Sequence, residues 1–129
     1  MIKILYVGFG GFLGSISRYL LSGAVQKLFP ATLSFPTGTF AVNIVGCLAI
    51  GFLGSIAETR QVFSAEMRML LFIGFLGGFT TFSTFGFETF SLLRDQQYVS
   101  AISNIFLHII IGITAVWLGF ILARFVFGE

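Results

Sequence analysis

Hydrophobic residues gather into four long runs that fill almost the whole chain, and short polar stretches separate these runs. The runs cover roughly Ile2 to Leu28, Gly38 to Ala57, Met67 to Leu93 and Tyr98 to Phe127. An α-helix of about 20 apolar residues crosses the hydrocarbon core of a bilayer. The pattern therefore predicts an all-α membrane protein in which residues 1–129 form one domain of four transmembrane helices. An even number of spans also places both termini on the same side of the membrane.

Composition supports a membrane environment. The 129 residues are 57% hydrophobic and only 9% charged, whereas soluble domains carry about 25% charged residues. A soluble domain of this size could not bury so much apolar surface. We therefore expect a multi-pass protein of the cell membrane, which would be the inner membrane in a Gram-negative source. The formal net charge of +2 comes without a basic stripe, so nucleic acid is not an expected partner.

Side chains suited to catalysis are scarce. The chain contains one cysteine (Cys47), one histidine (His108) and one aspartate (Asp95). A metal site made of histidine and cysteine is therefore excluded within one chain. Asp95 lies in a predicted loop, so a hydrolase triad cannot be assembled from these residues. We do not expect an enzyme.

Positive residues are almost balanced between the two ends of the predicted helices. One side carries Lys3, Arg60, Arg68 and Arg124, and the other carries Lys27 and Arg94, with Arg18 close to that end. An excess of Lys and Arg in short loops sets the orientation of a membrane protein. A bias of four against two or three is weak. Charge alone therefore leaves open whether the chain inserts in one orientation or in both.

Polar and small residues recur at intervals of four in three of the apolar runs, so that each row shares one helix face. The rows are Gly10, Gly14, Arg18 and Ser22; Asn43, Cys47, Gly51 and Ser55; and Ser100, Asn104, His108 and Gly112. The spacing of Gly10 and Gly14 favours close helix packing. Arg18 is expected either to face protein and water or to reach the membrane interface. The row with Asn104 and His108 indicates either a hydrated stripe or interhelical hydrogen bonds, and a lone histidine is more often a packing residue than a proton carrier.

The third run has an unusual centre. Gly74, Gly77 and Gly78 precede a mixture of hydroxyl and phenylalanine side chains that ends at Phe85. Because glycines weaken a helix, we expect the helix to open at them and to free backbone carbonyls, which need partners in a dry interior. Oxygen atoms are the ligands of small hard cations, and a second chain across a two-fold axis would complete such a shell. The hydroxyls and the positive ring edges suit an anion, although the rings equally suit ordinary packing.

Glu88 is the one acidic residue well inside an apolar run, between Phe87 and Phe90. Carboxylates inside membranes are candidates for function. We interpret Glu88 as a charge partner for Arg18, as an electrostatic gate or as part of an ion pair near the interface.

The segment from Gly74 to Phe85, which reads GFLGGFTTFSTF and is followed by Glu88, closely resembles the signature of the Fluc/CrcB fluoride channels. The similarity extends over essentially the whole chain, because Gly38, Thr39, Asn43 and Gly46 in the second run and Gly14 and Arg18 in the first also match.

The resemblance implies that two identical chains insert in opposite orientations and form an antiparallel, dual-topology homodimer. It also implies that the third helix of each chain is broken and that the two third helices cross at the centre. A structural Na+ would be held there by backbone carbonyls at Gly77 and Thr80.

The same resemblance implies two fluoride pores in each dimer. Phe82 and Phe85 match the phenylalanines that line the pores, Asn43 matches a hydrogen-bond donor, and Ser83 and Thr84 match neighbouring polar positions.

Further residues extend the implied path at its ends. Arg18 matches a vestibule arginine, and Glu88 matches an acid near the other end of the same region. On the fourth run, this chain has Asn104 and His108 where other members often have a tyrosine and serines. We still count Asn104 and His108 among the pore residues, and His108 would make conduction more sensitive to pH.

The implied function is passive export of fluoride from the cytoplasm, which would reduce fluoride toxicity. An alternative is a proton-coupled small multidrug-type transporter, which is also a short, four-span, dual-topology dimer with an intramembrane glutamate. Those transporters carry their carboxylate in the first span, and the first run here contains no acidic residue. A third possibility is a membrane adaptor that transports nothing.

Overall fold

The computed structural model describes residues 2–29 and 35–128, and these residues form helices with short connections and no β-strand. The elements are α1 (Ile2–Leu28), α2 (Thr37–Thr59), α3 (Ala65–Arg68), the π-helix η1 (Met69–Leu76), α4 (Gly77–Phe79), α5 (Phe82–Arg94) and α6 (Tyr98–Phe127).

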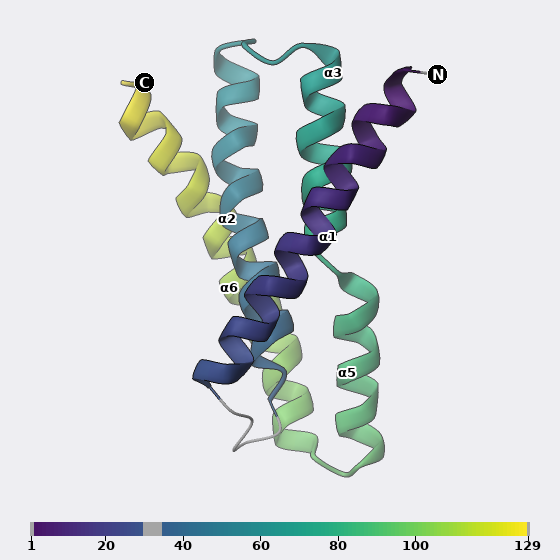
Figure 1. Cartoon of the computed structure of the whole chain (residues 1–129). Helices are drawn as coiled ribbons and strands as arrows, with labels where there is room; N and C mark the ends of the chain where they lie inside the picture. Colours follow the sequence, from purple (N-terminus) through teal and green to yellow (C-terminus); the bar gives the residue numbers. More distant parts are fainter. Residues whose placement is uncertain (1, 30–34, 129) are drawn as a thin grey trace.

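Within the described residues, four segments are long and apolar enough to cross a membrane, namely Ile2–Leu28, Thr37–Thr59, Ala65–Arg94 and Tyr98–Phe127. The prediction of an all-helical, multi-pass membrane protein is therefore confirmed. Figure 1 shows the two termini at one end of the molecule together with the connection between α2 and α3. The turn between α5 and α6 lies at the opposite end.

Two pairs of helices provide most of the packing, α2 with α6 and α1 with η1. Both pairs depend on glycines that let backbones approach. A Cβ atom on Gly10 of α1 would lie 2.9 Å from the backbone nitrogen of Phe75 in η1, and one on Gly119 of α6 would lie 2.9 Å from that of Phe52 in α2. Any side chain at these positions would therefore push the helices apart. The close approach predicted from the Gly10 and Gly14 spacing is confirmed.

The glycines of the third span do not open the helix, so that expectation was wrong. Gly77 has helical dihedral angles, with φ −64° and ψ −36°. A Cβ atom on Gly74 would lie 2.8 Å from the Val7 carbonyl oxygen, and one on Gly78 would lie 2.6 Å from the Gly11 carbonyl oxygen. These two glycines therefore serve the contact with α1.

Helical geometry is lost three residues after Gly77. Thr80 has φ −80° and ψ 159°, and Thr81 has φ −150° and ψ 110°. Both residues are extended, so α4 ends at Phe79 and α5 begins at Phe82. In Figure 1 this short connection lies near mid-height of the molecule, beside α1.

Candidate functional site

The connection between α4 and α5 is held by the hydroxyl groups of its two threonines. The Thr80 hydroxyl donates to the Leu76 carbonyl at 2.9 Å. Thr81 is the N-cap of α5, because its hydroxyl oxygen accepts from the Thr84 amide at 3.3 Å. The same hydroxyl donates to the Thr84 hydroxyl at 2.8 Å. A threonine in this position satisfies one of the free amides at the start of a helix.

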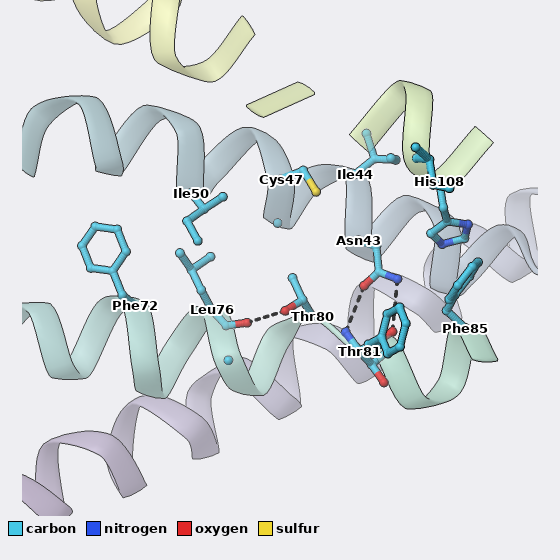
Figure 2. A pocket seen from close by; sticks show the side chains of 14 residues that line it. Asn43, Ile44, Cys47, Ile50, Phe72, Leu76, Thr80, Thr81, Phe85 and His108 are labelled. Atoms are coloured by element: carbon cyan, nitrogen blue, oxygen red, sulfur yellow. Dashed lines mark hydrogen bonds between the residues drawn. The ribbon is translucent and has the colours of Figure 1, made fainter. Parts of the chain in front are cut away.

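Asn43 of α2 reaches across to this connection. Its side-chain oxygen accepts from the Thr81 backbone amide at 2.9 Å, and its side-chain nitrogen donates to the Thr81 carbonyl at 3.2 Å. Figure 2 shows both bonds. The amide of Asn43 thus takes the place of a neighbouring peptide group. It provides the acceptor that the helix does not supply to the Thr81 amide, and it is a second donor to the Thr81 carbonyl besides the first turn of α5.

These hydrogen bonds leave two carbonyls without their helical donors. In an α-helix the amide of residue i donates to the carbonyl of residue i−4. The Thr81 amide would pair with Gly77, but it donates to Asn43 instead. The Thr84 amide would pair with Thr80, but it donates to the Thr81 hydroxyl instead. The carbonyls of Gly77 and Thr80 therefore retain unused acceptor capacity beside the connection.

A cavity of about 460 Å³ lies next to the connection, between α2, the third span and α6. It brings together six of the residues predicted to form the site, which are Asn43, Gly77, Thr80, Phe82, Phe85 and His108. The rest of its wall is mainly apolar and includes Ile44, Ile50, Phe72 and Leu76. Figure 2 shows Asn43, Thr80 and Thr81 near the centre of the view, with Phe85 and His108 together at one end.

Aromatic rings form one end of this cavity. The ring centroids of Phe82 and Phe85 are 5.6 Å apart, and those of Phe85 and His108 are 4.5 Å apart. Phe40 also packs against the His108 ring, in a T-shaped arrangement with centroids 5.1 Å apart. Phe82 is 84% exposed in the single chain, so its ring is free to contact an ion or a second subunit.

A second cavity, of about 410 Å³, holds Arg18 together with Thr84. Its other polar lining residues are Ser15, Tyr19, Ser22, Gln26, Thr39 and Thr81. Arg18 therefore lines a different cavity from Phe85 and His108, and Thr81 lines both cavities. Ser83 is exposed and lines neither of these two cavities.

Glu88 is paired with Thr39. The Thr39 hydroxyl donates to Glu88 Oε1 at 2.6 Å, and Glu88 Oε2 is buried without a hydrogen-bond partner among the described residues. No ion pair joins Glu88 to Arg18 within residues 2–29 and 35–128. Of the three interpretations of Glu88, the structure therefore gives no support to the charge partner for Arg18.

The polar row on α6 does not form one hydrated stripe. Asn104 is fully buried and is not part of the cavity wall. Its side-chain nitrogen donates to the Thr89 hydroxyl at 2.8 Å, and that hydroxyl donates to the Phe85 carbonyl at 2.8 Å. Asn104 therefore joins α6 to α5, and His108 is the member of the pair that lines the cavity.

Two residues of this region make contacts that the sequence did not predict. Thr39 matters as the donor to Glu88, and Thr89 matters as the link between Asn104 and Phe85. The spacing of four between Phe85 and Thr89 is a weak signal that a hydroxyl can reach a carbonyl one turn back. The polar row on the fourth run indicated interhelical hydrogen bonds as one alternative for Asn104, but it did not name Thr89 as the partner, because that contact depends on how α5 and α6 pack.

Comparison with known proteins identifies the family. A family profile described as "CrcB-like protein, Camphor Resistance (CrcB)" matches residues 5–120. The chain belongs to the CrcB family. This CrcB-family chain is 44% identical over 124 residues to the fluoride-specific ion channel FluC of Methylobacillus flagellatus, covering 96% of each protein. It is 45% identical over 124 residues to FluC of Geotalea uraniireducens, covering 96% of this chain and 98% of that protein.

A relative from a third genus has the same name. FluC 1 of Methanosarcina acetivorans, also a fluoride-specific ion channel, is 46% identical over 119 residues, which cover 92% of this chain and 88% of that protein. These relatives are ion channels and not enzymes, as expected for this chain. The similarity covers nearly the full length in all three cases, so the site residues lie within the shared part.

Proposed function

We propose that this chain is the subunit of a fluoride-specific ion channel that exports F− passively from the cytoplasm and so reduces fluoride toxicity. Membership of the CrcB family and the three FluC relatives support the substrate. The observation that carries the proposal is one cavity in which Phe82, Phe85 and His108 lie beside the Asn43–Thr81 pair. This cavity combines ring edges with fixed polar groups inside an otherwise apolar protein.

The chemistry of the cavity wall suits a small anion. The edges of phenylalanine rings carry partial positive charge, and Asn43 keeps one side-chain N–H that the Thr81 carbonyl does not use. Hydroxyls of Ser83 and Thr84 add donors close by on the first turn of α5. A path of fixed donors replaces the water shell of fluoride, and a narrow width disfavours the larger chloride ion.

The free carbonyls fit a structural Na+. Small hard cations take oxygen ligands, and the Gly77 and Thr80 carbonyls lack their helical donors beside an exposed face. When bound, Na+ would satisfy these carbonyl dipoles. Because one chain offers two of them, the shell requires a second chain.

We therefore propose an antiparallel, dual-topology homodimer in which the interrupted third spans of two chains meet at Gly77 and Thr80. The near balance of positive residues between the two ends is compatible with insertion in both orientations. Phe82, which is 84% exposed, would become covered at this interface or line its pore.

The direction of transport follows from electrostatics. An inside-negative potential drives an anion outward with about 2.3 kcal/mol per charge for each 100 mV. Arg18 in the second cavity would attract fluoride at one entrance, and Glu88 would act electrostatically near the other. Neither ATP nor a coupled ion is needed.

Efflux of fluoride from liposomes tests the proposal. Purified protein should release F− under a potential and should release Cl− at least a hundredfold more slowly, and Phe82→Ile and Phe85→Ile should abolish most of the F− flux. Phe125→Ile is the matched control, because Phe125 of α6 is also 84% exposed and lies outside the cavity. Equal flux in the Phe82 and Phe125 variants would refute the role of the rings.

The dimer and its cation need a separate measurement. A single cysteine placed at Gly77 in a Cys47→Ala background should cross-link two chains, because Gly77 would face its counterpart. Ile113 of α6 is 68% exposed, and a single cysteine at that position should not cross-link two chains. Replacement of Na+ by a large organic cation should lower flux and weaken the dimer. A monomer that conducts fluoride equally well without Na+ would contradict this part of the proposal.

A further inference from the structure

The His108 ring is fixed at one nitrogen and open at the other. Its Nδ1 lies 2.9 Å from the Asn104 carbonyl oxygen. A carbonyl oxygen only accepts hydrogen bonds, so Nδ1 must carry the proton and donate it. In the neutral ring this leaves Nε2 with a lone pair and no hydrogen. The hydrogen bond to the backbone of α6 thus selects one tautomer of His108.

The second nitrogen is buried and unsatisfied. Nε2 has no hydrogen-bond partner among the described residues. The ring is flanked by Phe85 at 4.5 Å and Phe40 at 5.1 Å between centroids, and His108 lines the cavity of about 460 Å³. A buried polar atom without a partner calls for a water molecule or an ion. The phenylalanine rings offer no such partner, and we expect it to come from the cavity that His108 lines.

The protonation state decides what that partner is. Neutral His108 presents a lone pair at Nε2, which repels an anion and accepts from water. Protonated His108 presents an N–H there, which donates to an anion. An isolated imidazolium in an apolar wall is unfavourable, and so is an isolated fluoride ion. Together they form a neutral, hydrogen-bonded pair, so each favours the entry of the other.

We propose that, in the fluoride channel proposed above and resting on that function, His108 Nε2 is a fluoride-binding position that takes up the anion together with a proton. Fluoride occupancy at this position therefore rises as the pH falls. The step balances, because an N–H bond forms at Nε2 as an O–H bond of hydronium breaks in the solvent. Fluoride then accepts a hydrogen bond from this N–H, and the proton stays on Nε2.

Other titratable groups near the ring are few. Cys47 of α2 lines the same cavity. On α5, Glu88 lies one turn beyond Phe85, but it is hydrogen-bonded to Thr39 and lines a different cavity. The lining residues contributed by η1, α4 and α6 include no charged side chain. His108 is therefore the group through which pH would act on this cavity.

A spectroscopic titration tests the site without reference to transport. The chain contains one histidine, so ¹⁵N-histidine labelling gives one pair of ring signals in the purified protein. At high pH these signals should report a proton on Nδ1 and none on Nε2. Fluoride at ten times its dissociation constant should raise the titration midpoint of His108 by about one pH unit. A ligand that binds only the protonated form stabilises that form by a factor of one plus the ratio of ligand concentration to dissociation constant. Chloride at the same concentration should leave the midpoint unchanged.

Transport supplies the second readout. Fluoride efflux from liposomes, corrected for protein-free vesicles, should increase by up to about tenfold per pH unit on the alkaline side of the midpoint. His108→Gln keeps an uncharged donor and should conduct without this pH dependence, whereas Cys47→Ala should retain it. A midpoint that fluoride does not move, or equal pH dependence in His108→Gln, would overturn the proposal while leaving the channel function intact. A fluoride-dependent midpoint in a protein that conducts no fluoride would uphold the site and refute the channel.

Discussion

The side chain of Asn43 pairs with both backbone groups of Thr81, at 2.9 Å and 3.2 Å. The two residues are 38 positions apart in sequence, on different spans. The pair resembles one rung of a β-ladder placed inside a helical protein. It stabilises an extended residue midway along the apolar segment Ala65–Arg94, and unpaired backbone groups inside a membrane would cost several kcal/mol. The geometry of the cavity therefore depends on one side-chain amide.

Removal of this amide should destabilise the connection. Asn43→Ala leaves the Thr81 amide without a partner, because this amide donates to the Asn43 side chain. We expect the free energy of unfolding to fall by about 2 kcal/mol, since an orphaned buried backbone group costs about 1–3 kcal/mol. Equilibrium unfolding in mixed micelles measures this change. Leu48→Ala on the exposed side of α2 (39% exposed) should cost much less. Similar losses in both variants would show that the pair adds nothing.

The cap on α5 should be measurable through Thr81 itself. Thr81→Ala removes the oxygen that accepts from the Thr84 amide, so stability should fall by about 1 kcal/mol, which is typical for the loss of an N-cap. Thr81→Ser keeps that oxygen and should stay within a few tenths of a kcal/mol of the unaltered protein. Thermal unfolding in detergent distinguishes them. If serine fails to rescue alanine, the methyl group and not the hydroxyl is what matters at this position.

Backbone contact between α1 and the third span predicts opposite effects for two glycines of the same helix. Gly14→Ala places a Cβ atom 2.9 Å from the Phe79 nitrogen, so we expect a loss of about 1–3 kcal/mol from overpacking. Gly8→Ala meets nothing within 4 Å, and it should be neutral or stabilising by up to about 1 kcal/mol because alanine favours helix. Unfolding curves measured under the same conditions compare the free energies of unfolding of the two variants. A Gly8→Ala loss as large as that of Gly14→Ala would count against the contact.

The hydrogen bond between Asn104 and Thr89 should appear as coupling between the two residues. In a double-mutant cycle with Asn104→Leu and Thr89→Val, the coupling free energy should be about 0.6–1.7 kcal/mol, the range of such bonds within membranes. Because Thr89 also donates to the Phe85 carbonyl, each single variant should lower fluoride flux several-fold by displacing the Phe85 ring. Additive stabilities would mean that the bond is not formed in the membrane.

Much of the fold follows from the sequence alone. The four spans, the location of their ends and the membrane environment depend on hydrophobicity and length, which are local properties of each run. The family was also visible locally, because the residues from Gly74 to Phe85 with Asn43 and Arg18 form a specific pattern that the comparison with known proteins confirms. Six of the predicted site residues indeed line one cavity.

Tertiary structure decided the details of the site. Gly74 and Gly78 were interpreted as points where the helix opens, but they lie within helical segments and α1 packs against their backbone. The helix ends at Phe79, and Asn43, from another span, pairs with the extended backbone of Thr81 that follows. Asn104 and His108 share one face of α6 by spacing, yet Asn104 is buried against Thr89 and His108 reaches the cavity. The spacing of residues in the sequence determines which side chains share one face of a helix. The partners of these side chains depend on where the neighbouring helices lie, and sequence spacing does not determine those positions.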